Sequence, residues 1–136
     1  MWCAIILAGG SGSRMGAGRN KVLLSIEGET VLCRSVRAFL PRMEQLVLVV
    51  RPEDETAIHQ ALAASGLADA PIRFALGGAD RQASVWSGLC ALPAECDHVL
   101  IHDGARCLVD EGTIRRVMAA VEASGTGVAA VPVTDT

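Results

Sequence analysis

Short runs of apolar residues alternate along this chain with segments in which apolar residues recur at helical spacing. Continuous apolar runs bounded by glycine, proline or polar residues are typical of strands buried on both faces, as in parallel sheets. Runs of this kind predict five strands, at residues 3–8, 45–50, 72–76, 98–102 and 127–133.

The segments between these runs predict four helices. Pro41 ends the first helix and Pro52 opens the second. Asp80 and Asp110 are suited to cap the third and fourth, and Gly125 to end the fourth. The apolar positions of the four helices are 32, 36, 39 and 40; then 58, 61 and 62; then 85, 89 and 92; then 114, 117, 118 and 121.

Alternating strands and helices predict an α/β fold with a mainly parallel, Rossmann-like sheet flanked by helices. We expect residues 1–136 to form a single nucleotide-binding domain, incomplete because the chain stops directly after a strand-like run. In such sheets, ligands bind at the carboxyl ends of the strands. The segments to inspect are therefore 8–21, 77–84 and 103–106.

Composition and charge narrow the possible functions. Hydrophobic residues make up 51% of the chain, which is typical of a folded protein. With 12 basic and 15 acidic side chains the net charge is −3, so general nucleic-acid binding is not expected. The five cysteines include no C-x-x-C pair, and the opening apolar run is too short to cross a membrane. We therefore expect a cytoplasmic protein without a membrane partner.

The first of the three segments combines glycines with two cations. Gly9, Gly10 and Gly12 follow the first strand, and Arg14 and Lys21 come after them. Glycines allow backbone N–H groups to wrap a phosphate chain, and the two cations supply the charge that a polyphosphate needs. The alternative interpretation is a glycine turn that binds nothing.

Two common phosphate-binding loops do not match this segment. The Walker pattern requires Ser or Thr after its lysine, whereas Val22 follows Lys21 here. The dinucleotide fingerprint requires a third small residue at the position of Met15. An NAD-dependent dehydrogenase is therefore a poor match.

The second segment begins with a glycine pair and continues into an expected helix. It reads Gly-Gly-Ala-Asp-Arg-Gln-Ala-Ser-Val-Trp-Ser-Gly-Leu over residues 77–89. Arg81 falls in the first turn of that helix, where a cation opposes the helix dipole, so an anionic partner is indicated. A glycine turn before a capped helix, with Arg81 in solvent, is the alternative.

The third segment, His-Asp-Gly-Ala-Arg-Cys, lies at the end of a strand. Asp103 and Arg106 are three residues apart, and without a ligand they form at most a local ion pair. His102 is expected to be structural rather than a general base.

Together these segments resemble the sugar- and polyol-phosphate cytidylyltransferases, most closely the 2-C-methyl-D-erythritol 4-phosphate cytidylyltransferase family. The resemblance rests on Leu-Ala-Gly-Gly-x-Gly-x-Arg-Met-Gly, Gly-Gly-x-x-Arg-x-x-Ser-Val-x-x-Gly-Leu, His-Asp-x-Ala-Arg and the closing Pro-Val-x-Asp-Thr. It covers the whole chain in the family's order. One departure is Cys107, which stands where the family has proline.

The resemblance implies that this chain transfers CMP from CTP, with Mg²⁺, to 2-C-methyl-D-erythritol 4-phosphate in isoprenoid biosynthesis. Ala8, Gly9, Gly10 and Gly12 would wrap the triphosphate, while Arg14 and Lys21 would be catalytic. Gly78, Ala79 and Ser84 would read cytosine, with Arg81 near the phosphates. Asp103 would bind metal and substrate; Arg106 and Thr136 would contact the substrate.

Several points stay open at the level of the sequence. Ribitol-5-phosphate cytidylyltransferases share the same motifs, so the polyol acceptor is not determined. A catalytically inactive CTP-binding module is the second alternative. We expect the full-length protein to be a homodimer, of which this chain is the N-terminal part.

Overall fold

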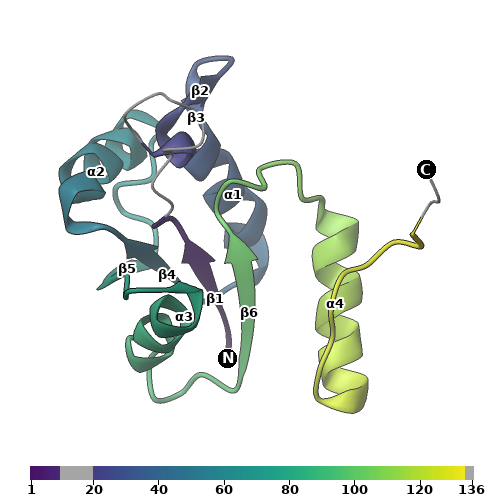
Figure 1. Cartoon of the computed structure of the whole chain (residues 1–136). Coiled ribbons are helices and arrows are strands. Elements are labelled where there is room, and N and C mark those ends of the chain that lie inside the picture. The colour runs from purple at the N-terminus through teal and green to yellow at the C-terminus, as the bar shows by residue number, and fades with distance from the viewer. Residues whose placement is uncertain (10–19, 134–136) are drawn as a thin grey trace.

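The computed structural model describes residues 1–9 and 20–133 (Figure 1). Four strands form a parallel sheet in the order β5-β4-β1-β6. They are β1 (Trp2–Leu7), β4 (Gln45–Val50), β5 (Ile72–Leu76) and β6 (His98–Asp103). A small antiparallel pair, β2 (Ser25–Ile26) and β3 (Glu29–Thr30), precedes the first helix. The predicted parallel α/β fold is confirmed.

The four predicted helices are also confirmed. They are α1 (Val31–Phe39), α2 (Glu55–Ala64), α3 (Arg81–Cys90) and α4 (Glu111–Ser124), and the short 3-10 turns are η2 (Lys21–Leu23), η3 (Leu40–Arg42) and η4 (Pro52–Asp54). Asp80 caps α3 by accepting from the Ala83 amide, and Asp110 caps α4 by accepting from the Thr113 amide. Gly125 ends α4 with φ 86°, the left-handed conformation that glycine adopts without strain.

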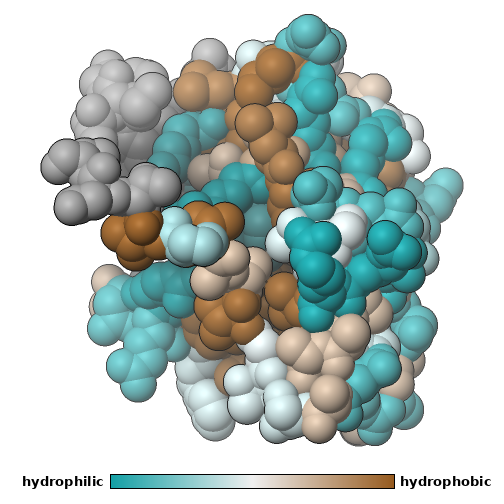
Figure 2. Space-filling view, turned by 90° about the vertical axis from the view of Figure 1, so that its right-hand side faces the viewer, coloured by the Kyte–Doolittle hydropathy of each residue, from teal (hydrophilic) through white to brown (hydrophobic). Residues whose placement is uncertain are grey.

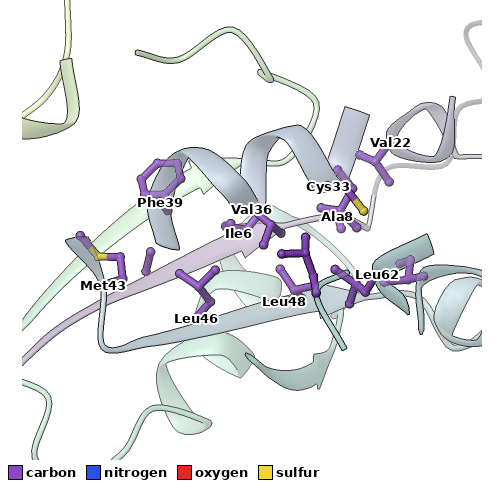
Figure 3. Packing of buried hydrophobic residues seen from close by; sticks show 14 of the residues in the cluster. Ile6, Ala8, Val22, Cys33, Val36, Phe39, Met43, Leu46, Leu48 and Leu62 are labelled. Carbon is purple, nitrogen blue, oxygen red and sulfur yellow. The ribbon is translucent and has the colours of Figure 1, made fainter. Parts of the chain in front are cut away.

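Alternate residues of the central strands face opposite layers of helices. The larger core joins Ile6 and Leu48 to residues of α1 and α2, such as Val36 and Ile58. Figure 3 shows the α1 side chains of this cluster lying over the residues of β1 and β4. On the other face, Ile5 and Val49 pack with Leu89 and its neighbours near the end of α3. Helices on both faces leave the carboxyl edge of the sheet free for a site.

The predicted fifth strand at 127–133 is wrong. The structure has no strand there, and the segment runs back along α4 (Figure 1). Gly127 lies so close to α4 that a Cβ on it would be 2.9 Å from the Ala120 Cβ. An apolar run becomes a strand only where a neighbouring strand bonds its N–H and C=O groups. Within the described part of the chain, this segment lies against α4 and has no strand as its neighbour.

Candidate functional site

A cavity of about 350 Å³ opens at the carboxyl edge of the sheet, between the ends of β1, β4 and β6. All three sequence segments singled out above contribute to it. The predicted site residues that line it are Gly9, Lys21, Gly78, Ala79, Arg81, Ser84 and Asp103. Gly9 and Asp103, which are 94 positions apart in the sequence, therefore line the same cavity, because parallel strands end at a common edge.

Hydrogen bonds fold the second segment onto the rim of this cavity. The Gly77 amide donates to the Val50 carbonyl at 2.9 Å, which continues the pairing of β4 with β5 by one hydrogen bond. The Gly78 amide donates to the Ser84 hydroxyl oxygen at 3.0 Å. That leaves the hydroxyl hydrogen of Ser84 to donate, and the structure gives it no acceptor among residues 1–9 and 20–133.

Gly78 has a packing reason to be glycine. A Cβ at this position would lie 2.4 Å from the Cβ of Ala83, well inside van der Waals contact. At Gly77 the nearest atom would be the Ser84 Oγ at 3.5 Å, an ordinary contact. Only the second glycine of the pair is therefore required by the close approach of the loop to α3.

Lys21 reaches the cavity from η2, which it begins. Asn20 caps this turn, and the Leu24 amide closes it by donating to the Lys21 carbonyl at 3.1 Å. The lysine side chain then lies in the same cavity as Arg81 and Asp103. Asp80 also lines this cavity, but its carboxylate accepts from the Ala83 amide as the cap of α3. The two cations and the remaining carboxylate, that of Asp103, suit a polyphosphate with its metal ion.

Asp103 ends β6 and is in register with Leu7 of β1. Its Oδ1 accepts from the Ala105 amide at 3.1 Å, and the Gly104 amide donates to the Leu7 carbonyl at 2.8 Å. No group of three potential metal-ligating side chains occurs among the described residues. One carboxylate is nevertheless a normal protein contribution to Mg²⁺, which takes its other ligands from phosphates and water. The residues present fit the predicted metal in that form.

Arg106 lies apart from Lys21, in a second cavity of about 450 Å³ between β6 and α4. Asp103 and Arg81 line both cavities. The turn before Arg106 closes through its amide, which donates to the Asp103 carbonyl at 3.0 Å. The turn therefore forms with Cys107 in place of proline.

His102 contacts the backbone of this turn through its ring. Its Nε2 is 2.9 Å from the Arg106 carbonyl oxygen, and its ring packs against Phe39 with centroids 4.8 Å apart. Burial lowers the pKa of His102 from its ordinary 6.5, although the hydrogen bond to Arg106 acts in the opposite direction. These contacts agree with the structural role expected for it.

The other predicted site residues do not line the first cavity or are not described. Ala8 is fully buried: its amide donates to the Val49 carbonyl, and its carbonyl accepts from Asn20. It was predicted to contact the nucleotide, but its backbone groups are used inside the protein. Gly10, Gly12, Arg14 and Thr136 lie outside the described residues.

A buried polar network was missed by the sequence analysis. Asp54 accepts hydrogen bonds from both Asn20 and Arg51, and Asn20 is itself part of the cavity lining. The only signal in the sequence is an asparagine directly before the predicted catalytic lysine. Its partner is 34 residues away, so one sequence alone does not reveal the pairing.

None of the helices formed by residues 1–9 and 20–133 combines the length and apolar character needed to span a bilayer. The cytoplasmic location stays a prediction.

Comparison with known proteins identifies the family. The model of the family described as "IspD: 2-C-methyl-D-erythritol 4-phosphate cytidylyltransferase" matches residues 2–136. A 2-C-methyl-D-erythritol 4-phosphate cytidylyltransferase of Prochlorococcus marinus (strain MIT 9313) is 46% identical over 134 residues, which are 97% of this chain and 58% of that protein. A bifunctional enzyme IspD/IspF of Clavibacter michiganensis subsp. michiganensis is 42% identical over 136 residues, covering 97% of this chain and 33% of that protein.

A solved structure agrees with these sequence matches. The crystal structure of 4-diphosphocytidyl-2C-methyl-D-erythritol synthase from Anaerococcus prevotii DSM 20548 superposes with a TM-score of 0.75 at 28% identity, covering 90% of this chain and 51% of that one. The chain thus spans about 58% of the length of its similar single-function relatives. On the evidence of its site and of these matches, the chain belongs to the 2-C-methyl-D-erythritol 4-phosphate cytidylyltransferase family.

Proposed function

We propose that this chain carries the CTP site of an enzyme that transfers CMP from CTP to 2-C-methyl-D-erythritol 4-phosphate and releases pyrophosphate. The observation that supports it best is the cavity that gathers Lys21, Arg81, Ser84 and Asp103 at the carboxyl edge of the sheet. Family membership supports the same reaction.

The base and the phosphates of CTP would occupy different parts of this cavity. The backbone of Gly78 and Ala79 offers hydrogen bonds suited to the edge of a pyrimidine. So does the hydroxyl hydrogen of Ser84, which has no acceptor among the residues that the structure describes. Lys21 and Arg81 offer positive charge to the triphosphate, and Arg14 is proposed to join them.

The reaction proceeds without a covalent bond between the protein and the substrate. A phosphate oxygen of the acceptor attacks the α-phosphorus of CTP in line, a new P–O bond forms, and the bond to the β-phosphate breaks. The acceptor phosphate is already an anion, so no general base is required. Lys21 stabilises the charge that builds on the α-phosphate oxygens in the transition state.

Asp103 would hold the divalent ion, with Mg²⁺ proposed. When bound, the ion neutralises phosphate charge and orients the leaving group. We further propose that the full-length protein is a homodimer, in which Arg106 and Thr136 contact the acceptor phosphate.

The experiment that tests this function is calorimetric titration of the chain with CTP and with GTP, each with Mg²⁺. We expect CTP to bind and GTP to bind much more weakly. Ser84→Ala should weaken CTP binding, whereas Ser87→Ala, one turn along α3 and outside the cavity lining, should not. Equal binding of CTP and GTP would contradict a pyrimidine site.

A second assay separates the enzyme from an inactive binding module and identifies the acceptor. Release of pyrophosphate is followed with 2-C-methyl-D-erythritol 4-phosphate and, separately, with ribitol 5-phosphate. We expect turnover with the erythritol phosphate. Turnover only with ribitol 5-phosphate would replace the proposed acceptor, and CTP binding without turnover on either would favour the binding module.

A further inference from the structure

The buried Asn20 side chain ties together two segments that flank the predicted phosphate loop. Its Nδ2 donates to the Ala8 carbonyl at 2.5 Å and to an Asp54 carboxylate oxygen at 3.1 Å. Asn20 is fully buried and Asp54 is 7% exposed. A polar side chain is retained in such a place only when hydrogen bonds replace the water that it loses.

The third hydrogen bond of Asn20 caps the turn that Lys21 begins. Its Oδ1 accepts from the Val22 amide at 3.2 Å, which caps the turn η2. The amide group therefore uses both of its donor hydrogens and its oxygen. Because Lys21 is the first residue of η2, the direction in which its side chain leaves the backbone is set by these contacts.

Asp54 and Arg51 extend the network to the end of β4. The Arg51 Nε donates to the same Asp54 oxygen at 2.9 Å, and the Asp54 amide donates to the Arg51 carbonyl at 3.0 Å. The network thus joins the end of β1, the turn that carries Lys21, and the end of β4. Those are three of the borders of the proposed CTP cavity.

We infer that Asn20, with Asp54 as one of its hydrogen-bond partners, is a positioning residue that holds Lys21 in the CTP cavity for the transfer step. This inference rests on the proposed function. A network that served stability alone would lower the folded population when broken, but it would not act through Lys21. The two roles therefore predict different results in kinetic measurements on paired variants.

Asn20→Asp is the most informative single change, because it keeps the size of the side chain and removes its donors. A carboxylate at position 20 faces the Ala8 carbonyl and the Asp54 carboxylate, and both contacts become repulsive. We expect turnover to fall about 10- to 100-fold, approaching the loss caused by Lys21→Ala. Asp54→Asn keeps the bond from Asn20 to Ala8 and should cost much less.

The double variant Asn20→Asp/Lys21→Ala tests whether the two residues act together. If Asn20 acts by positioning Lys21, the double variant turns over no more slowly than Lys21→Ala alone. In the double variant Asn20→Asp/Asp54→Asn, the amide at position 54 can donate to the carboxylate at position 20. No side chain at position 20 then donates to the Ala8 carbonyl. We expect this variant to stay as slow as Asn20→Asp.

Leu62→Ala is the stability control. Leu62 lies in the core on α2 and does not line the cavity, so its loss should lower the unfolding temperature and leave the turnover of folded protein unchanged. A ligand-free readout is also available, since Lys21 is the only lysine in the chain. After ¹³C reductive methylation, its NMR signal should move in Asn20→Asp and stay in place in Leu62→Ala.

The outcomes separate the two proposals. The positioning role would be overturned, in a chain that is otherwise active, by either of two results. One is a loss of turnover in the double variant Asn20→Asp/Lys21→Ala equal to the product of the two single losses, and the other is an unmoved Lys21 signal in Asn20→Asp. A chain without any CTP-dependent turnover would overturn the proposed function and this inference with it.

Discussion

Lys21 is the residue on which the proposed chemistry depends most directly, since it enters the cavity from a capped turn. We predict that Lys21→Ala lowers turnover about 100-fold or more and changes the affinity for CTP much less, because charge on the α-phosphate builds mainly in the transition state. Rates of pyrophosphate release and calorimetric titration measure the two quantities. Equal losses in both would mean that Lys21 only binds the ground-state nucleotide.

The glycine pair provides a matched test at the other end of the cavity. We predict that Gly78→Ala abolishes CTP binding, because the new Cβ would meet that of Ala83 at 2.4 Å and force the loop away from α3. Gly77→Ala meets nothing closer than 3.5 Å and should bind CTP nearly as well as the unaltered chain. Titration of both variants with Mg²⁺ and CTP checks this, and similar affinities would contradict it.

His102 makes the stability of the chain depend on pH. Its folded-state pKa lies below the ordinary 6.5, so the unfolded chain binds a proton at higher pH than the folded chain does. The free energy of unfolding should therefore decrease as the pH falls below about 6.5, as far as the folded pKa. The nearest charges, Asp103 and Arg106, act on His102 in opposite directions.

Urea unfolding between pH 5 and pH 7.5 measures this dependence. We expect His102→Gln to flatten it, because glutamine fills a similar volume and does not titrate. An unchanged slope in that variant would assign the pH dependence to other groups.

At the scale of elements, the contact between α3 and the sheet decides where the second loop lies. Gly88 faces β1, and a Cβ there would be 2.7 Å from Ile5 Cγ2 and 3.1 Å from Val49 Cγ2. We predict that Gly88→Ala destabilises the fold by about 1–3 kcal/mol, because the added methyl group overpacks the contact and forces α3 away from the sheet. It should also weaken CTP binding, because α3 carries Arg81 and Ser84.

Gly112 on α4 is the matched control for this change. A Cβ there meets only the flexible end of Arg116 at 3.2 Å and an Asp110 oxygen at 3.5 Å. Gly112→Ala should stabilise the chain by up to about 1 kcal/mol, as alanine normally does in a helix. Thermal unfolding of the two variants gives the comparison, and destabilisation of the same size in both would contradict the packing argument.

At the scale of the whole molecule, apolar side chains remain exposed on the side of α4. Figure 2 shows this face, where hydrophobic side chains appear in patches among polar ones. Val128, Val131 and Val133 are between 84% and 97% exposed. Exposed apolar surface of this kind commonly marks a contact with another protein segment.

We predict that the chain associates with itself as its concentration is raised. Replacing the three valines with serine should keep it monomeric, since less apolar area is then removed from water on association. Sedimentation velocity at several concentrations measures the effect. If the unaltered chain stays monomeric at every concentration, this surface does not mediate self-association.

Much of the fold could be predicted from the sequence because its signals are local. The apolar runs of β1 and β4 and the helical spacing of α1 each lie within about ten residues. The capping roles of Asp80 and Asp110 are equally local, since each accepts from an amide three residues ahead. The motifs that predicted the CTP site are likewise short segments, each directly after a strand.

The parts that failed or were missed depend on partners far away in the sequence. Residues 127–133 have the composition of a strand, but only a neighbouring strand could make them one, and they lie along α4 instead. Likewise, the sequence could not show that the backbone groups of Ala8, predicted to bind the nucleotide, bond to Val49 and Asn20.

The sequence by itself therefore determined the four helices, the four strands of the parallel sheet and the fold class, and it predicted which residues would form the site. Only the tertiary structure decided which of those residues share the cavity, that Arg106 lies in a second one, and that the Asn20 side chain bonds to Asp54. The physical reason is that periodicity and capping act between near neighbours in the chain. Burial and the pairing of buried polar groups depend instead on segments that folding alone brings together.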